Sequence, residues 1–214
     1  MQKSKTIFWD WNGTLLNDLH ICIDAINILL RERNKPVIDQ QIYRNIFTFP
    51  VRDYYVKAGF DFEAEPFEKP ALEFIEQYEQ LIKEAALFDD VTESLDYFRK
   101  MEYKQMILSA MQQDFLKELV SSHNIEHYFS KISGIDDHYA TGKVETARKL
   151  ISGLNSHDGE LIMIGDTVHD HEVGEELGIR VILVSRGHQS EERLKETGCE
   201  VAQNFKQVIE LINP

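Results

Sequence analysis

The sequence has little cysteine and no long apolar run, and each shortage excludes a class of protein. Its two cysteines, Cys22 and Cys199, lie far apart in the chain, which excludes a disulfide framework and favours a reducing compartment. No apolar stretch approaches the roughly 18 residues of a membrane span, and the N-terminal residues show no signal peptide. We therefore expect a cytoplasmic protein with no membrane partner.

Basic residues are also scarce. Lys and Arg number 23 against 37 Asp and Glu, so the formal net charge is −14. Such a surface repels nucleic acid, so we expect no nucleic-acid partner. The same surface repels a free phosphate ester, so any site for that anion must be locally positive.

The chain between residues 16 and 89 shows helical periodicity throughout. Apolar side chains recur at helical spacing over residues 17–33 and again over residues 66–86. Shorter helices are expected at residues 39–47 and 51–58, where Pro50 separates them. The block therefore predicts an all-helical unit.

The rest of the chain alternates between short apolar runs and helical patterns. We expect strands at the following residues: 6–9, 105–108, 131–135, 161–164 and 180–184. This alternation is typical of a parallel sheet covered on both faces. The predicted fold is α/β, a Rossmann-like parallel sheet core (1–15 and 90–214) with an inserted all-helical cap domain (16–89).

Polar residues follow the predicted strands at the ends where parallel sheets bind ligands. Asp10, Ser109, Asp166 and Asp170 all lie just past such ends. Carboxylates that converge on one edge repel each other unless a cation binds there, and oxygen ligands favour Mg²⁺. Lys143 follows a glycine and would add the local positive charge that phosphoryl oxygens need.

Four of these segments, in this order along the chain, resemble the motifs of the haloacid dehalogenase superfamily. They are residues 10–14 (Asp-Trp-Asn-Gly-Thr), Ser109, Lys143 and residues 165–170 (Gly-Asp-Thr-Val-His-Asp). The resemblance covers essentially the whole chain and includes the helical C1 cap. Residues 49–61 resemble the caps of phosphoglycolate-phosphatase-like members. The resemblance implies a phosphatase of a small phosphorylated metabolite, acting as a monomer or homodimer.

The resemblance also implies a role for each matching residue. Asp10 would be the nucleophile that forms an aspartyl-phosphate. The carboxylates of Asp10 and Asp166 and the backbone carbonyl of Asn12 would bind Mg²⁺, with Asp170 binding it directly or through water. The phosphate-binding residues would be Ser109, Ala110, Lys143 and Thr14, and Lys143 would bridge phosphate and nucleophile.

Asn12 departs from the family pattern, because phosphatases of this superfamily usually carry a general acid/base aspartate there. An amide cannot hold a titrating proton, and general acid–base catalysis contributes roughly 10²–10⁴ in rate. Four explanations stay open: a phosphatase that is slow or needs a good leaving group, a phosphate-ligand-binding regulatory protein, deamidation of the Asn-Gly pair, or an engineered change. A phosphotransferase (mutase) is a further alternative.

Other residues have a functional and an ordinary interpretation. Arg44, Arg52 and Lys57 in the cap could meet a substrate anion, or form a solvated helix face. Residues 136–140 (Asp-Asp-His-Tyr-Ala) resemble a loop of some relatives, or are a polar loop in which Tyr139 packs. His169 and His171 are expected to be surface residues at the start of a helix.

Overall fold

The computed structural model describes residues 5–135, 142–154 and 159–213. Its centre is a six-stranded parallel sheet in the order β3-β2-β1-β4-β5-β6. The strands are β1 Lys5–Trp9, β2 Lys104–Gln112, β3 Lys131–Ile135, β4 Glu160–Gly165, β5 Arg180–Val184 and β6 Glu200–Ala202. The predicted α/β class with a helical insert is therefore confirmed.

Strand β1 lies at the middle of the sheet, between β2 and β4. Trp9 pairs with Ile107 on one side and with Ile164 on the other. This register brings the residues that follow β1 and β4 to the same carboxyl edge.

Alternate side chains of the strands enter two separate apolar clusters, because successive residues of a strand point to opposite faces. On β1, Ile7 and Trp9 pack into one cluster and Phe8 into the other. Helices α5 Val91–Lys100, α6 Gln113–Ser122 and α10 Phe205–Ile212 contribute to the first cluster. Helices α7 Lys143–Ser152, α8 Val168–Leu177 and α9 Glu191–Lys195 contribute to the second.

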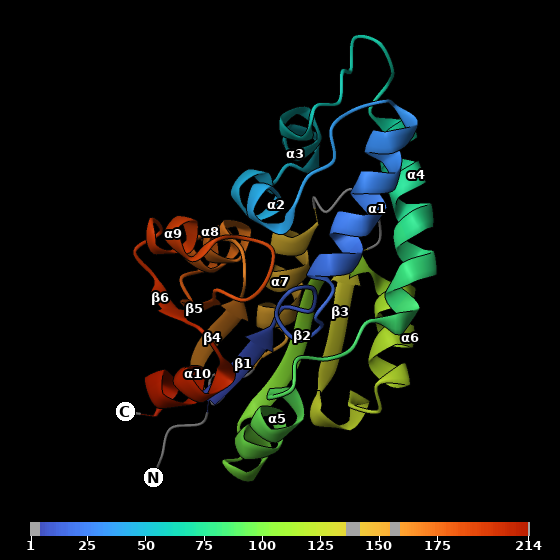
Figure 1. The fold of residues 1–214 in the computed structure, drawn as a ribbon. Helices are drawn as coiled ribbons and strands as arrows, with labels where there is room; N and C mark the ends of the chain where they lie inside the picture. The colour runs from blue at the N-terminus through green and yellow to red at the C-terminus, as the bar shows by residue number, and fades with distance from the viewer. Residues whose placement is uncertain (1–4, 136–141, 155–158, 214) are drawn as a thin grey trace.

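Four helices of the insert lie over the carboxyl ends of the strands (Figure 1). They are α1 Leu19–Glu32, α2 Gln40–Ile46, α3 Val51–Ala58 and α4 Glu68–Leu81. Helices α1 and α4 pack against each other, and α5, the last helix before β2, packs on the sheet beside α10. Among the described residues, no helix is long and apolar enough to cross a membrane.

Three details differ from the sequence-based expectation. The helix expected over residues 66–86 ends at Leu81 and continues as a short 3₁₀ turn, Ile82–Glu84. Strand β2 runs on to Gln112, so Ser109 and Ala110 lie inside the strand and not beyond it. The segment after Val184 forms α9, β6 and α10, none of which the sequence patterns predicted.

Candidate functional site

Three carboxylates meet at the carboxyl edge of β1 and β4. Asp10 directly follows β1, and its backbone N–H donates to the carbonyl of Ile164 on β4 at 2.8 Å. Asp166 follows β4, and Asp170 lies in the first turn of α8. One oxygen from each of the three carboxylates lies within 4.8 Å of the others, and all three residues are buried. The structure thus assembles the cluster that the strand-end pattern predicted.

Lys143 supplies a positive charge to this cluster. It is the first residue of α7, and its side chain is only 3% exposed. Its Nζ contacts Oδ1 of Asp10 and lies 2.6 Å from Oδ1 of Asp170. A buried charge is costly unless it is paired, so these two ion pairs hold the ammonium in place.

The second oxygen of Asp170 is occupied by the loop that begins α8. Its Oδ2 accepts from Thr167 Oγ1 at 2.7 Å and from the backbone N–H groups of Thr167 and Asp166 at 3.0 and 3.2 Å. Thr167 and Asp170 together form a capping box. Asp170 therefore fixes the Asp166 loop and orients Lys143.

Gly165 and Gly13 are required by the close packing around these carboxylates. A Cβ at Gly165 would lie 2.3 Å from Cγ of Asp170, and one at Gly13 would lie 2.3 Å from Oδ2 of Asp166. Gly13 also has a φ of +68°, which favours glycine. Both glycines let the loops approach closely enough to assemble the cluster.

Burial and mutual repulsion disturb the ionisation of the cluster. Burial raises the pKa of Asp10 to about 8, with a contribution from Asp170 and Asp166, although Lys143 opposes it. Burial, together with Asp170, raises the pKa of Asp166 to about 6. Burial disfavours the charge on Asp170 too, but Lys143 outweighs it and lowers the pKa of Asp170. Such shifts are typical of functional sites.

The donor set fits a magnesium ion. Three carboxylate oxygens within 4.8 Å of one another form an all-oxygen group of the kind that Mg²⁺ binds through one or two carboxylates and several waters. A cation here would also relieve the repulsion that raises the pKa values of Asp10 and Asp166. All three carboxylates already have protein partners: Lys143 contacts Asp10 and Asp170, and Asp166 accepts from Thr14 Oγ1 and from the backbone N–H of His188.

The predicted phosphate-binding residues are placed unequally. Ala110 lines the cavity above the cluster. Ser109 is 1% exposed inside β2, and its Oγ accepts from the backbone N–H of Met111 at 3.1 Å. Thr14 Oγ1 donates to Oδ1 of Asp166 at 3.2 Å. Neither Ser109 nor Thr14 is among the described residues that line the cavity.

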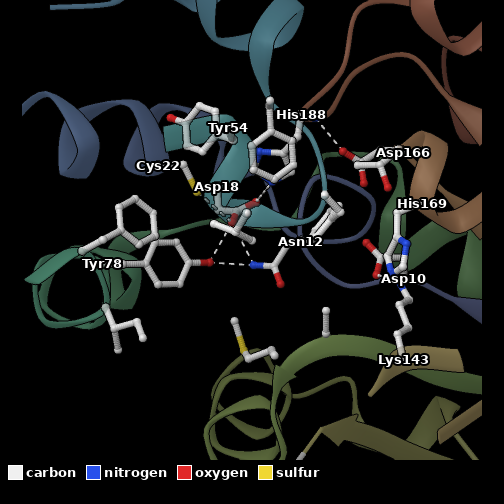
Figure 2. Close-up of a pocket in the computed structure, with 18 of the residues that line it drawn as sticks. Asp10, Asn12, Asp18, Cys22, Tyr54, Tyr78, Lys143, Asp166, His169 and His188 are labelled. Carbon is white, nitrogen blue, oxygen red and sulfur yellow. Dashed lines mark hydrogen bonds and ion pairs between the residues drawn. The ribbon is translucent and has the colours of Figure 1, made fainter. Parts of the chain in front are cut away.

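The side chain of Asn12 is held by the cap side of the site (Figure 2). Its Nδ2 donates to Oδ2 of Asp18 at 2.8 Å and to the hydroxyl of Tyr78 on α4 at 2.6 Å. The Tyr78 hydroxyl in turn donates to Oδ2 of Asp18 at 2.7 Å. The backbone N–H of Gly13 donates to Oδ1 of Asp18 and to the carbonyl of Leu16. Residue 12 therefore connects the nucleophile loop to α4 as a hydrogen-bond donor.

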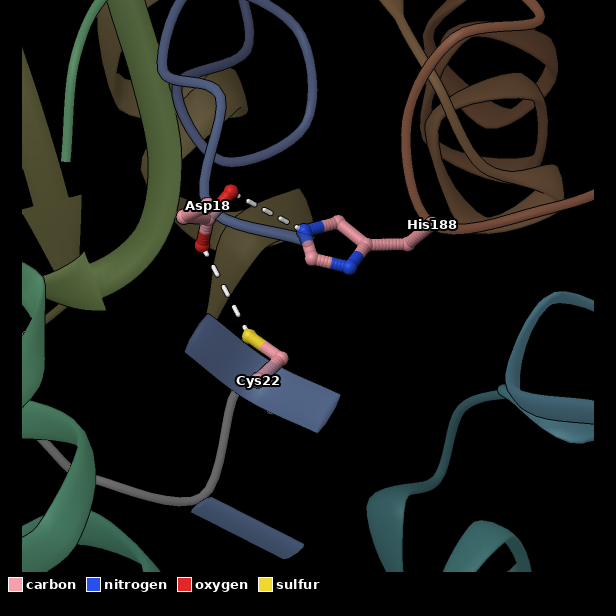
Figure 3. Close-up of side chains that lie close together, drawn as sticks. All are labelled: Asp18, Cys22 and His188. Carbon is pink, nitrogen blue, oxygen red and sulfur yellow. Dashed lines mark hydrogen bonds and ion pairs between the residues drawn. The ribbon is translucent and has the colours of Figure 1, made fainter. Parts of the chain in front are cut away.

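Asp18 is also paired with a histidine that the sequence analysis did not single out. Its Oδ1 lies 3.2 Å from Nε2 of His188, and its Oδ2 lies 3.7 Å from Sγ of Cys22 (Figure 3). His188 Nδ1 lies 3.1 Å from the hydroxyl of Tyr43 on α2, and its backbone N–H donates to Oδ2 of Asp166 at 2.5 Å. The Asp18–His188 pair thus ties the insert to the Asp166 loop.

The ionic character of this pair follows from its pKa shifts. Burial disfavours both charges, but His188 lowers the pKa of Asp18 to about 2, and Asp18 raises the pKa of His188 to about 9. The carboxylate of Asp18 accepts hydrogen bonds from Gly13, Tyr78 and Asn12 as well. Because these donors already satisfy it, we interpret the Asp18, Cys22 and His188 group as a structural connection.

A cavity of roughly 220 Å³ lies between the cluster and the insert. Asp10, Lys143, Asp166 and Asp170 line its floor, together with Asn12. Aromatic side chains from the insert line its walls: Tyr43, Phe47, Phe49, Tyr54, Tyr55, Phe74 and Tyr78.

The cap cations that the sequence analysis considered lie elsewhere. Arg44 donates to the backbone carbonyls of Gly187 and Arg186. Arg52 lies over the ring of Phe62, and Lys57 is exposed on α3. None of the three lines the cavity among the described residues. The predicted loop at residues 136–140 lies outside the described residues.

Comparison with known proteins gives a family match over most of the chain. The model of the family described as haloacid dehalogenase-like hydrolase matches residues 7–184. An N-acetylmuramic acid 6-phosphate phosphatase from Pseudomonas putida is 24% identical over 87% of this chain and 85% of the relative. A phosphoglycolate phosphatase from Caulobacter vibrioides is 25% identical over 92% of this chain and 85% of the relative.

The fold also matches solved structures. A haloacid dehalogenase-like hydrolase from Streptococcus pneumoniae superposes with a TM-score of 0.82 at 20% identity, with all of both chains covered. The arrangement of sheet and insert is therefore shared with this structure from end to end.

Proposed function

Because the chain belongs to the haloacid dehalogenase-like hydrolase family and is a phosphatase of it, we propose that it hydrolyses a small phosphate monoester or acyl phosphate through a covalent aspartyl-phosphate on Asp10. The relatives named above are phosphatases of small phosphorylated metabolites. The observation that carries the proposal is the buried cluster in which Lys143 contacts both Asp10 and Asp170.

Each residue of the cluster has a place in this reaction. Asp10 attacks phosphorus, the bond from phosphorus to the leaving oxygen breaks, and water then releases phosphate and regenerates the carboxylate. Lys143 stabilises the transferred phosphoryl oxygens, and Asp170 holds Lys143 in position. Ala110 from β2 would offer its backbone amide to the phosphoryl group, with Ser109 and Thr14 supporting the loops. Asp10, Asp166 and the Asn12 carbonyl would hold a magnesium ion, which would supply charge neutralisation.

Asn12 restricts the reaction in this proposal. Its amide cannot protonate the leaving oxygen, and it is already engaged as a donor to Asp18 and Tyr78. The substrate must therefore have a leaving group that departs without a proton. Hydrolysis of the aspartyl-phosphate lacks the same acid/base and is expected to be slow.

The test is Mg²⁺-dependent phosphate release from acetyl phosphate, because acetate leaves without a proton. Asp10→Asn should abolish release, whereas Asp24→Asn, the same change at an exposed position on α1, should leave it unchanged. Retained release in Asp10→Asn would refute the mechanism. Mg²⁺-dependent binding of phosphate without release by the wild type would favour the alternative, a regulatory protein.

A further inference from the structure

In the proposed phosphatase, the leaving group of the substrate would lie in the cavity above the cluster. The identity of that leaving group therefore rests on the proposed function. We infer that the substrate is the phosphate ester of an uncharged aromatic alcohol, in which a phenolate is the leaving group. Three independent features support this class: the charges of the cavity wall, its aromatic composition and the amide at residue 12.

The described cavity wall has no cation for a second anionic group. Lys143 is the one lysine or arginine that lines it, and both of its ion pairs are with the floor carboxylates. The sequence of residues 136–141, which precedes Lys143, contains no lysine or arginine either. Two histidines also line the cavity, but His188 is paired with Asp18 and Nδ1 of His169 lies 3.3 Å from Oε2 of Glu172. A carboxylate or second phosphate would therefore be buried there without a counterion, which is costly.

Two arginines of the insert are held by other partners, so small movements of these two side chains would not supply a cation. Arg33 lies 2.5 Å from both Glu65 and Glu73, and Arg44 donates to backbone carbonyls of the core. In contrast, Glu79 on α4 lines the cavity and adds a negative charge to its wall. The wall thus disfavours anionic leaving groups, including glycolate.

The wall suits a flat ring. Tyr43 and Phe47 stack with their centroids 5.2 Å apart, and Phe74 and Tyr78 stack with theirs 5.8 Å apart. Aromatic side chains favour ring partners in offset or edge-to-face geometry. The volume of roughly 220 Å³ is adequate for one ring with its phosphoryl group, since a cavity of about 150 Å³ holds benzene.

Two polar atoms of the wall have no hydrogen-bond partner within the described part of the structure. They are the hydroxyl of Tyr54 and Nε2 of His169, and both residues line the cavity. His169 also lies against the ring of Phe49, with centroids 4.7 Å apart. Buried polar atoms are rarely left unpaired, and neutral polar substituents on a bound ring would pair them.

The chemistry at residue 12 selects the same class. A phenol has a pKa near that of tyrosine, about 10, whereas an aliphatic alcohol resembles water at about 15.7. In the first step, an Asp10 oxygen bonds to phosphorus and the bond to the phenolic oxygen breaks. The electron pair leaves on the phenolate, which takes its proton from solvent afterwards. Asn12 imposes no penalty on this step, because no acid is needed.

A comparison of kcat/KM for phenyl phosphate and 4-carboxyphenyl phosphate with Mg²⁺ tests whether the cavity disfavours a charged leaving group. The two leaving groups are similar phenolates, and the second adds a negative charge at the far end of the ring. We expect phenyl phosphate to be favoured by at least about tenfold. Equal values, or a preference for the carboxylate, would overturn the inference.

A comparison of kcat/KM for phenyl phosphate and for cyclohexyl phosphate, which has a similar size, tests whether the enzyme needs a phenolate leaving group. Without an acid, phenyl phosphate should be favoured by at least about 100-fold in kcat/KM. A ratio near one would overturn the inference. Hydrolysis of acetyl phosphate is measured in parallel. If acetyl phosphate is hydrolysed but phenyl phosphate is not preferred over the other two esters, the aryl substrate class alone is refuted. If none of the substrates is hydrolysed, both the aryl class and the proposed function are refuted.

A charge variant links the preference to the cavity wall. Glu79→Lys should raise kcat/KM for 4-carboxyphenyl phosphate relative to phenyl phosphate by about threefold or more. Glu76→Lys makes the same change on α4, at a residue that does not line the cavity, and should leave the ratio unchanged. An unchanged ratio in Glu79→Lys, or an equal change in both variants, would show that the leaving group does not occupy this cavity.

Discussion

Asn12 is a donor in a buried network, and this role explains why an amide suits the position. Its Nδ2 serves both Asp18 and Tyr78, and the neighbouring Gly13 N–H serves Asp18 as well. A carboxylate at position 12 would lose both donations and face the charge of Asp18. The same contacts engage the Gly13 N–H that would have to attack the Asn12 side chain during deamidation.

Restoring the usual aspartate should therefore be costly for the fold. We expect Asn12→Asp to lower the free energy of unfolding by about 1–3 kcal/mol near neutral pH, because it removes two hydrogen bonds and adds a repulsive charge. Asn12→Ala removes the donor without adding charge and should cost less. Urea denaturation measures both. If the Asn12→Asp variant is as stable as the wild type, the donor role of Asn12 towards Asp18 and Tyr78 does not stabilise the fold.

The Asp18–His188 pair predicts a dependence of stability on pH. The pKa of His188 rises from 6.5 to about 9 on folding, so its contribution is fully present below about pH 6.5 and is lost as pH rises through 9. The pKa of Asp18 falls from 3.8 to about 2, so its contribution is present above about pH 3.8 and is lost as pH falls towards 2.

We expect the stability difference between wild type and His188→Gln to shrink between about pH 6.5 and 9, by on the order of 3 kcal/mol. Urea denaturation in the presence of EDTA, at several pH values, measures it. A difference that stays constant across this range would show that His188 is not charged in the folded protein.

The proximity of Asp10, Asp166 and Asp170 could be predicted from residue patterns, because each follows a strand of one parallel sheet. Asp18 and His188 could not. Asp18 directly precedes α1, but its side chain makes no cap bond to that helix and instead contacts Gly13, Tyr78 and His188. His188 lies in the loop after β5, and nothing in its neighbours along the chain indicates a partner 170 residues away.

At the scale of elements, the strands before Val184 were predictable because each is a short apolar run between helical patterns. Two of the later elements were missed because they are short: β6 has three residues and α9 five. Strand β2 is longer than its apolar run, because its pairing with β3 resumes at Gln112 after a register shift that begins at Leu108. Tertiary pairing, and not local preference, sets that boundary.

The hydroxyl of Tyr78 connects helix α4 to the nucleophile loop by hydrogen bonds. Tyr78→Phe removes the hydrogen bonds to Asn12 and Asp18 while keeping the ring. We expect it to lower the free energy of unfolding by about 1–2 kcal/mol and to raise KM for acetyl phosphate. Tyr97→Phe on α5, whose hydroxyl makes no hydrogen bond to the described residues, is the matched control. Equal changes in the free energy of unfolding and in KM for Tyr78→Phe and Tyr97→Phe would show that the Tyr78 hydroxyl does not connect α4 to the nucleophile loop.

At the scale of the whole molecule, a surface with net charge −14 surrounds a site that must accept an anion. In the proposed reaction, the positive character of the site would come from Lys143 and a bound cation, and not from the surface. Cation binding and the ionisation of the cluster are therefore coupled, because the ligand carboxylates must be deprotonated.

This coupling predicts how Mg²⁺ affinity depends on pH. Since the pKa values of Asp166 and Asp10 are about 6 and 8 without metal, binding should tighten as pH rises from about 6 to 8 and should release protons. Isothermal titration calorimetry in two buffers of different ionisation enthalpy measures both effects. In the Asp10→Asn variant, the increase in Mg²⁺ affinity near pH 8 should disappear. Affinity independent of pH would contradict the assignment of the cluster as the metal site.

The central claim is that Asp10 becomes phosphorylated and that the intermediate accumulates because residue 12 carries no acid/base. The most direct measurement is an acid quench of wild-type protein with acetyl phosphate and Mg²⁺, followed by peptide mass spectrometry. The account predicts a single phosphoryl group on Asp10, absent when Mg²⁺ is omitted. Phosphate release with no phosphoryl group on Asp10 at any quench time, or a phosphoryl group on another residue, would contradict it.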